Sequence, residues 1–163
     1  MFQSFIGGIV AYRALPRAQF STLQKNIFPP YFVLQSIAPV ALLLTYPRGG
    51  ASRLLPSLFS STKTLLPPSS SDNLSSYLIG TMLVTALANL VYVGPQTTEV
   101  MRLRKHQETR DGKKYDDAGA QSEEMKGLNW RFGVLHGVSS LVNMVGFGAM
   151  VWYGGVLAEM VRL

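Results

Sequence analysis

The sequence predicts an all-α integral membrane protein, a helical bundle of four-helix type. Hydrophobic residues make up 47% of the 163 residues and charged residues only 15%, below the quarter that is typical of soluble domains. Residues 74–94 and 132–158 carry no Lys, Arg, Asp or Glu over 21 and 27 positions. About 20 apolar residues cross a hydrocarbon core of about 30 Å, since a helix rises about 1.5 Å per residue. A soluble helical bundle, the alternative, rarely needs uncharged helices of this length.

The first apolar segment is short. Residues 1–12, MFQSFIGGIVAY, precede Arg13 and reach about half the length of a spanning helix. They lack the basic start and the small-residue cleavage site of a signal peptide. We interpret them as a partial helix, truncated at its N-terminus by the gene model or by an alternative start.

The second helix is expected at 31–46, with Pro29 and Pro30 before it and Pro47 after it. Its 16 residues are marginal for a span, but Ile27 and Phe28, or a locally thinner bilayer, would make up the difference. Pro39 removes a backbone donor and predicts a kink, which membrane helices tolerate when neighbours satisfy the freed carbonyl.

The remaining segments read as loops within a single domain, 1–163. Residues 13–30 form the first loop and the Ser- and Pro-rich residues 47–73 the second. The third, 95–131, is charged and partly helical, with a turn at Asp111-Gly112 between two helical extensions. If four helices alternate in direction, the first and third loops share one side and hold 11 of the 15 Lys and Arg residues. The positive-inside rule places that side in the cytosol.

Composition also narrows the function. The net charge of +6 in a membrane protein indicates contact with lipid headgroups, and no nucleic-acid partner is expected. There is no cysteine, and His106 and His136 are the only histidines, so no metal site or other cofactor is predicted. No phosphate-binding loop or nucleophile elbow is present, and the protein is not expected to be an enzyme. Membrane-protein partners and a homo-oligomer stay open, as does the organelle of this multi-pass protein.

Polar residues inside the apolar segments predict what we call the polar seam. Positions i, i+4 and i+7 share a helix face, which groups His136, Ser140 and Asn143, with Ser139 beside them. Asn89 lies deep in the third helix. Unpaired polar groups in hydrocarbon are costly, so these side chains should face the bundle interior and bond one another. The seam is either interhelical glue, aided by Gly133 and Gly137 at G-x-x-x-G spacing, or a pathway in which His136 relays protons or contacts a ligand. We favour the first.

The end of the third helix forms a predicted exit motif of Pro95, Thr97, Thr98 and Met101. Pro95 disfavours helical geometry at Gly94, so a kink or break is expected there, with helix restarting at Pro95. Thr97 and Thr98 are expected to bond carbonyls of the last membrane turn. The basic residues that follow at headgroup depth are Arg102, Arg104 and Lys105. They belong either to a simple joint at the membrane exit, which we favour, or to a site for anionic ligands or lipid headgroups.

Four segments in this order resemble the transmembrane protein 205-like family. The first is R-x-L-P-R-x-x-F, from Arg13 to Phe20, and the second is Phe28, Pro29, Tyr31 and Phe32 at the start of the second helix. The others are Asn89 followed by the exit motif, and His136, Gly137, Ser139, Ser140, Leu141 and Asn143. The resemblance implies a four-helix membrane protein, associated in animals with drug resistance and vesicle traffic. It also implies an additional N-terminal segment and supplies no catalytic residues.

Together these observations predict a non-enzymatic, multi-pass membrane protein with a role in membrane transport, trafficking or membrane organisation. The alternative is a transporter of small molecules or ions whose path the polar seam lines. A water-filled cavity reaching His136 would favour transport, and a closed, dry seam would favour a structural role.

Overall fold

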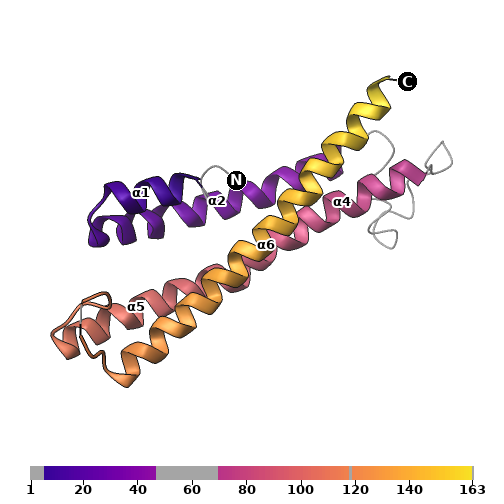
Figure 1. The fold of residues 1–163 in the computed structure, drawn as a ribbon. Coiled ribbons are helices and arrows are strands. Elements are labelled where there is room, and N and C mark those ends of the chain that lie inside the picture. The colour runs from indigo at the N-terminus through magenta and orange to yellow at the C-terminus, as the bar shows by residue number, and fades with distance from the viewer. Residues whose placement is uncertain (1–5, 47–69, 118, 163) are drawn as a thin grey trace.

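The computed structural model describes residues 6–46, 70–117 and 119–162, and every regular element in these ranges is helical. The all-α prediction is therefore confirmed. Three helices are long and apolar enough to cross a membrane: Arg17–Thr45, Asn73–Asp111 and Glu123–Met160. Figure 1 shows an elongated arrangement of α1 (Gly8–Ala14), α2 (Arg17–Thr45), α4 (Ser70–Leu87), the π-helical η2 (Ala88–Val93), α5 (Gly94–Asp111) and α6 (Glu123–Arg162).

The first two helices form a hairpin, in which α1 packs against the start of α2 (Figure 1). Leu15 between them is extended, with φ −109° and ψ 145°, because the ring of Pro16 disfavours helical geometry in the residue before it. Helix resumes at Arg17. The expectation of a loop over 13–30 is therefore wrong for all but Leu15 and Pro16, because residues 13 and 14 still belong to α1.

Pro29, Pro30 and Pro39 all lie inside the 29-residue helix α2. The expected start of the second helix at residue 31 is wrong, because Pro29 and Pro30 do not end it. Each proline leaves the carbonyl four residues earlier without its usual donor. For Pro29 and Pro30 these carbonyls belong to Lys25 and Asn26, whose residues are exposed, so solvent at the polar end of the bundle can replace the missing donors.

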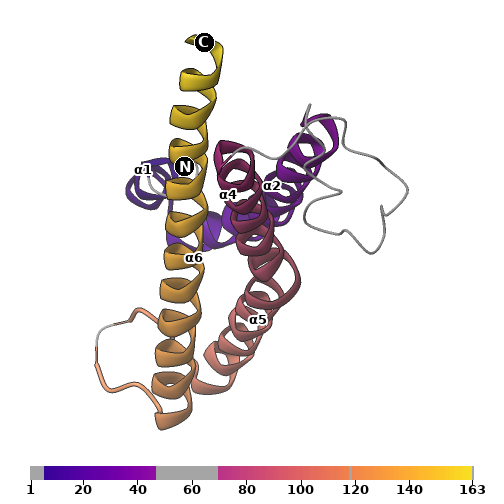
Figure 2. The same cartoon turned by 90° about the vertical axis from the view of Figure 1, so that its right-hand side faces the viewer.

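The third helix continues through Pro95 without a break. Gly94 is helical, with φ −60° and ψ −54°, and its N–H donates to the carbonyl of Asn89, five residues earlier. Figure 2 shows α4 passing into α5. The predicted break at Gly94 is thus wrong, whereas the predicted kink stays a prediction. A π turn over Ala88–Val93, which holds one residue more than an α turn, accommodates the proline instead.

A hairpin of α5 and α6 forms the charged end of the molecule. Gly112 takes the left-handed conformation, with φ 65°, and ends α5, so the predicted turn at Asp111-Gly112 is confirmed. Ser122 Oγ accepts the Met125 N–H at 3.2 Å and donates to Asp111 Oδ2 at 2.6 Å, which caps α6. The fourth helix therefore starts nine residues before the expected 132 and runs past 158, to Arg162.

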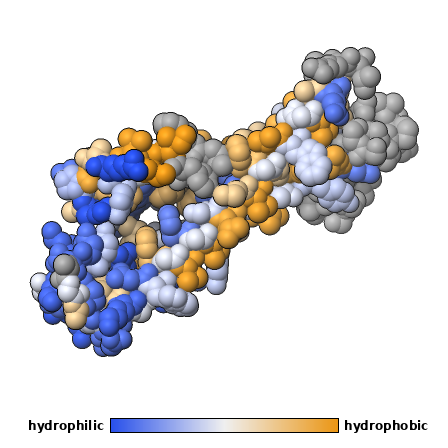
Figure 3. Space-filling model, in the orientation of Figure 1, coloured by the Kyte–Doolittle hydropathy of each residue, from blue (hydrophilic) through white to orange (hydrophobic). Residues whose placement is uncertain are grey.

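The apolar core lies at the opposite end, where α2 ends, α4 begins and α6 ends. It consists of Leu43, Tyr46, Leu78, Ile79, Met82, Ala149, Tyr153 and Val156. Figure 3 shows hydrophilic residues gathered over the α5–α6 end and hydrophobic residues over the middle of the bundle. Of the predicted loop 47–73, residues 47–69 lie outside the described ranges, and residues 70–73 already belong to α4.

An ion pair joins the start of α2 to the linker between α5 and α6. Arg17 Nε at the start of α2 lies 3.5 Å from Asp116 Oδ2 in the linker between α5 and α6. The α1–α2 connection and the α5–α6 linker therefore lie at the same end of the bundle, as the alternation of helices predicts for the first and third loops.

Candidate functional site

Three amide side chains from three helices meet in the middle of the bundle. Asn89 Nδ2 of η2 and Gln35 Nε2 of α2 each donate to Asn143 Oδ1 of α6, both at 3.1 Å. Asn89 is fully buried and Asn143 is 4% exposed. We call Gln35, Asn89 and Asn143 the amide cluster. The sequence prediction included the two asparagines but missed Gln35. The available signal was that Gln35 is an uncharged polar residue inside the apolar segment 31–46.

A main-chain carbonyl fixes the orientation of all three amides. Asn89 Nδ2 also donates to the carbonyl of Ser139 at 3.4 Å, and a carbonyl can only accept. The nitrogen of Asn89 must therefore face α6. Asn143 must then present its oxygen to that nitrogen, and Gln35 must present its nitrogen to the same oxygen. Reversing any one amide would bring two acceptors or two donors together.

This orientation leaves two acceptors over. Among the described residues, Asn89 Oδ1 and Gln35 Oε1 are buried and have no hydrogen-bond donor. A buried acceptor without a donor costs about 1–3 kcal/mol, and each such group in a native protein calls for a specific explanation. The amide cluster thus connects three helices by hydrogen bonds, and it contains two buried oxygens, Asn89 Oδ1 and Gln35 Oε1, that accept no hydrogen bond from the described residues.

The polar seam is only partly assembled by the fold. Ser139 contributes its carbonyl to Asn89, whereas His136 is exposed, stacks on Phe132 at a centroid distance of 5.9 Å, and accepts a bond from Ser140 at its own carbonyl. The buried face of α6 follows a spacing near 3.5 residues, through Met125, Leu128, Phe132, Leu135, Ser139, Asn143, Gly146, Ala149, Tyr153 and Val156. This spacing is typical of helices that wrap around each other. His136 and Ser140 each lie one position away from this buried face. The grouping of the two residues with Asn143 by i, i+4 and i+7 was therefore wrong.

Close helix approach occurs at a glycine that the sequence prediction did not select. A Cβ atom added to Gly133 or Gly137 would meet nothing within 4 Å, whereas one added to Gly146 would lie 2.6 Å from Thr85 Oγ1 of α4. The predicted G-x-x-x-G contact is therefore wrong. Gly146 lies on the buried face of α6, three residues from Asn143, and it permits the approach that lets the amide cluster form.

The exit motif forms local hydrogen bonds after the π turn. Thr97 Oγ1 donates to the Val93 carbonyl at 2.7 Å, and Thr98 Oγ1 donates to the Gly94 carbonyl at 3.0 Å. These are carbonyls of the last membrane turn, to which the sequence prediction assigned them. Pro95 is exposed and Met101 is half-buried. The motif acts as a continuous joint between the apolar and charged halves of one long helix.

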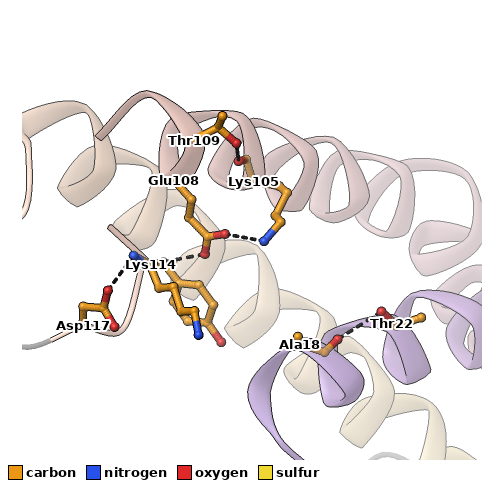
Figure 4. Close-up of polar contacts among 8 residues, drawn as sticks. Ala18, Thr22, Lys105, Glu108, Thr109, Lys114 and Asp117 are labelled. Carbon is orange, nitrogen blue, oxygen red and sulfur yellow. Dashed lines mark hydrogen bonds and ion pairs between the residues drawn. The ribbon is translucent and has the colours of Figure 1, made fainter. Parts of the chain in front are cut away.

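The three basic residues that follow do not converge on one point. Arg102 pairs with Glu99 at 2.6 Å, and Lys105 pairs with Glu108 at 2.8 Å (Figure 4). The Arg104 guanidinium lies over the rings of Tyr115 and Phe132, at 4.0 and 4.6 Å from their centroids. Burial raises the pKa of Tyr115, with Asp116 adding to the shift and Arg104 opposing it. Each cation is thus engaged within the hairpin.

An open groove of about 430 Å³ lies between α5 and α6 at this charged end. It is lined by Leu103, His106, Gln107, Arg110, Glu124, Gly127, Leu128 and Arg131. It does not include His136 or the amide cluster. Across the described ranges, no three His, Asp or Glu side chains stand together as metal ligands would.

These features define a class: an all-α membrane protein whose spans meet on buried amides and whose third and fourth helices extend into a charged hairpin. The chain belongs to the family of the domain of unknown function DUF4149, whose model matches residues 1–106. That match covers α1, α2, α4, η2 and most of α5.

One curated relative shares a shorter segment. Xanthocillin biosynthesis cluster protein D of Aspergillus fumigatus is 43% identical to this chain over 47 residues, which are 29% of this chain and 30% of that protein. The match therefore spans less than a third of the relative. No solved structure matches the chain.

Proposed function

We propose that this is a non-enzymatic, multi-pass membrane protein that serves membrane transport, trafficking or membrane organisation, with membrane lipids as its surroundings. The observation that carries the proposal is the amide cluster. The polar side chains that meet inside the spans are neutral amides that bond one another across three helices. Such bonds fix helix packing in membranes, and amides supply neither a nucleophile nor a general acid or base.

The charged hairpin supports a role in contacting other molecules. Its α5 and α6 extend beyond the apolar middle of the bundle (Figures 1 and 3), and the groove between them carries Arg110, Arg131 and Glu124 beside apolar side chains. Open surfaces that combine apolar and charged groups are typical of interaction sites.

Purification of the full-length protein in a mild detergent, followed by mass spectrometry of bound proteins and lipids, tests this proposal. We expect a reproducible set of membrane-protein partners or lipids that is reduced when Leu103 and Leu128 in the groove are both replaced by Ser. The matched control replaces the exposed Val91 and Leu141, which lie outside the groove, by Ser. An identical set with both variants would contradict a role for the hairpin.

A transporter of small molecules or ions is the second candidate. The unfilled acceptors of Asn89 and Gln35 favour it, because polar groups inside membrane spans often mark a pathway. Flux of a labelled cation or small solute into liposomes containing the protein tests this candidate. Flux equal to that of empty liposomes, with the protein folded and oriented, would contradict it.

Within the DUF4149 family, we infer that this chain is of the transmembrane protein 205-like kind. The support is the four motifs in order, of which two supply the asparagines of the amide cluster and a third supplies Phe32, which packs near Gly94. A phylogenetic tree of full-length family members tests this inference. Placement of the chain on a branch without these four motifs would contradict it.

A further inference from the structure

Arg110 and Arg131, one from each helix of the charged hairpin, form no ion pair within the described ranges. Arg102 and Lys105, by contrast, each pair with a glutamate three residues away on α5. Arg131 donates from Nη2 to the neutral Gln96 Oε1 at 3.3 Å, and the Arg110 side chain forms no hydrogen bond with the described residues. Two guanidinium groups of the hairpin are therefore not neutralised by a carboxylate.

Both arginines line the same groove. This is the open groove of about 430 Å³ between α5 and α6, to which Leu103 and Leu128 contribute apolar side chains. Gly127 leaves space in it, since a Cβ atom added there would meet nothing within 4 Å. The groove thus combines the two unpaired guanidinium groups with apolar surface, which suits a ligand that is anionic and amphiphilic.

His106 and Glu124 complete the polar lining of the groove. Arg102 Nη1 lies 3.4 Å from His106 Nε2. Because a guanidinium only donates, Nε2 is the acceptor, and the neutral imidazole carries its proton on Nδ1. Glu124 is the one carboxylate among the described residues that line the groove, and it forms no ion pair with any of them. Two guanidinium groups and one carboxylate give the groove a net positive charge, which attracts an anion.

One end of the groove lies at the membrane surface. Arg131 directly precedes the uncharged residues 132–158, and its hydrogen-bond partner Gln96 follows the uncharged residues 74–94. Both side chains therefore lie at the depth of the lipid headgroups, where basic residues meet anionic lipids. The groove is thus accessible to a lipid from the surrounding membrane.

The other end of the groove lies farther from the membrane. Ser122 Oγ donates to Asp111 Oδ2 at 2.6 Å, so Arg110, the residue before Asp111, lies level with the start of α6. Because Ser122 precedes Arg131 by nine residues, Arg110 lies roughly 10 Å beyond Arg131 on the side away from the membrane. A headgroup with one phosphate at the membrane surface and another farther out matches this spacing better than a single phosphate does.

We propose that this groove binds the headgroup of a phosphorylated inositol lipid, with the phosphodiester at Arg131 and a phosphate monoester at Arg110. Guanidinium groups bind phosphate oxygens through parallel N–H donors, and basic pockets between membrane helices on the cytoplasmic side bind such headgroups. The positive-inside rule places this end of the chain in the cytosol. The inference rests on the proposed role of the charged hairpin in contacting other molecules, and it names the class of ligand that its groove takes.

Calorimetric titration of the full-length protein in a mild non-ionic detergent tests the site. The probes are a short-chain phosphatidylinositol monophosphate, the short-chain phosphatidylinositol without the monoester, and free inositol bisphosphate. We expect saturable binding of the first probe and binding at least about fivefold weaker for the second, which lacks the phosphate at Arg110. The third lacks acyl chains and should also bind more weakly. No binding of the first probe, or equal binding of the first and third, would overturn the proposal.

Substitutions of opposite sign assign the binding to the groove. Arg110→Gln and Arg131→Gln should each weaken binding of the monophosphate lipid about fivefold, whereas Glu124→Gln should strengthen it, because it removes the opposing charge. Glu124 has no ion pair to lose, so that variant should fold even if Arg131→Gln does not. Arg13→Gln, at an exposed position of α1 outside the groove, is the matched control and should leave the affinity unchanged. Weaker binding by Glu124→Gln, or the same affinity for every variant, would overturn the proposal.

Failure of this inference and failure of the proposed function are distinguishable. In the first case no inositol lipid binds, but replacement of Leu103 and Leu128 by Ser still removes a protein partner in the co-purification. The lipid site is then overturned and the role of the hairpin stands. If no inositol lipid binds and the co-purified set is also unchanged, both are overturned.

Discussion

At the scale of single residues, Asn143 holds the membrane part together. Its Oδ1 accepts one hydrogen bond from α2 and one from η2, so one side chain connects three helices. Interhelical hydrogen bonds in membranes contribute about 0.6 kcal/mol on average and up to about 1.7 kcal/mol each. Losing the shared acceptor also leaves two buried donors unsatisfied, which adds to the cost.

Asn143→Leu is therefore expected to destabilise the folded protein by about 2–3 kcal/mol. Unfolding in mixed micelles with increasing fractions of sodium dodecyl sulfate measures this change. Ser140→Ala is the matched control, because the Ser140 hydroxyl bonds only the carbonyl of His136 one turn earlier; its effect should stay below about 0.5 kcal/mol. Equal effects of the two variants would show that Asn143 has no special role.

Gly146 sets the distance between α4 and α6. We expect Gly146→Ala to destabilise the protein by about 1–3 kcal/mol, because its Cβ would lie 2.6 Å from Thr85 Oγ1. Thr85→Ala in the same chain removes that atom and should restore part of the loss. Gly137→Ala, with nothing within 4 Å, should be neutral or stabilising by up to about 1 kcal/mol. Destabilisation by Gly137→Ala larger than that by Gly146→Ala would contradict the helix contact described here.

At the scale of elements, the π turn sets the relative rotation of α4 and α5. It contains one residue more than an α turn, and Gly94 permits it, since a Cβ there would lie 2.7 Å from the Asn89 carbonyl. The turn itself buries Asn89 and Val93, and α5 after it buries Val100 and Gln107.

Deletion of Val91 tests the role of the π turn, Ala88–Val93, directly. Val91 is 71% exposed, and its removal would convert the π turn to an α turn and keep the faces of α4 and α5 in place. We expect this variant to fold and to elute as a single peak on size exclusion. Deletion of Val138, an exposed residue of the regular helix α6, should rotate everything after it by about 100° and prevent folding. Misfolding of both deletions to the same extent would contradict the interpretation of the π turn.

The basic residues of α5 give a second prediction at this scale. Arg102 and Lys105 are held by Glu99 and Glu108 in exposed pairs, which contribute little stability. Replacing both by Gln should leave binding to vesicles that contain anionic lipid unchanged within about twofold, since each cation is already paired. Extending the change to Arg104 should reduce stability, because that side chain lies over Tyr115 and Phe132. A large loss of vesicle binding by the folded double variant would instead support the lipid-headgroup site.

At the scale of the whole molecule, the chain divides along its length into an apolar core, the amide cluster and the charged hairpin. The ion pair between Arg17 and Asp116 places the start of α2 and the α5–α6 linker at one end. The core of Leu43, Leu78 and Val156 lies at the other. A membrane around the apolar part would therefore hold the two connections that follow α1 and α5 on one side.

Single cysteines test this arrangement, because the chain contains none of its own. A cysteine at Lys113, in the α5–α6 linker, and one at Ser60, in the segment 47–73, should react with an impermeant maleimide from opposite sides of the membrane. A cysteine at Arg13 should react from the same side as the one at Lys113. Labelling of positions 60 and 113 from one side would refute the topology. By the positive-inside rule, the side of Lys113 is expected to be the cytosol.

The spanning helices and one helix end could be predicted from the sequence, because both depend on residues that are neighbours along the chain. Uncharged segments of 21 and 27 residues predicted two spanning helices, and Asp111-Gly112 predicted the turn that ends α5. Helix ends were less readable. Pro29 and Pro30 indicated a helix boundary, although α2 continues through both. The helical extension expected after Asp111-Gly112 was not recognised as the start of the fourth helix, which begins at Glu123.

A helical protein suited to a membrane, with Asn89 and Asn143 among its buried polar groups, could be predicted without the structure. Those properties follow from composition and spacing along one chain. The packing of the helices was needed to show that Gln35 completes the cluster, that His136 lies outside it, and that Gly146 rather than Gly137 lies in the helix contact. The reason is physical: the crossing of α2, α4 and α6 and the extra residue of the π turn decide which face of each helix is buried, and neither is encoded in any single segment.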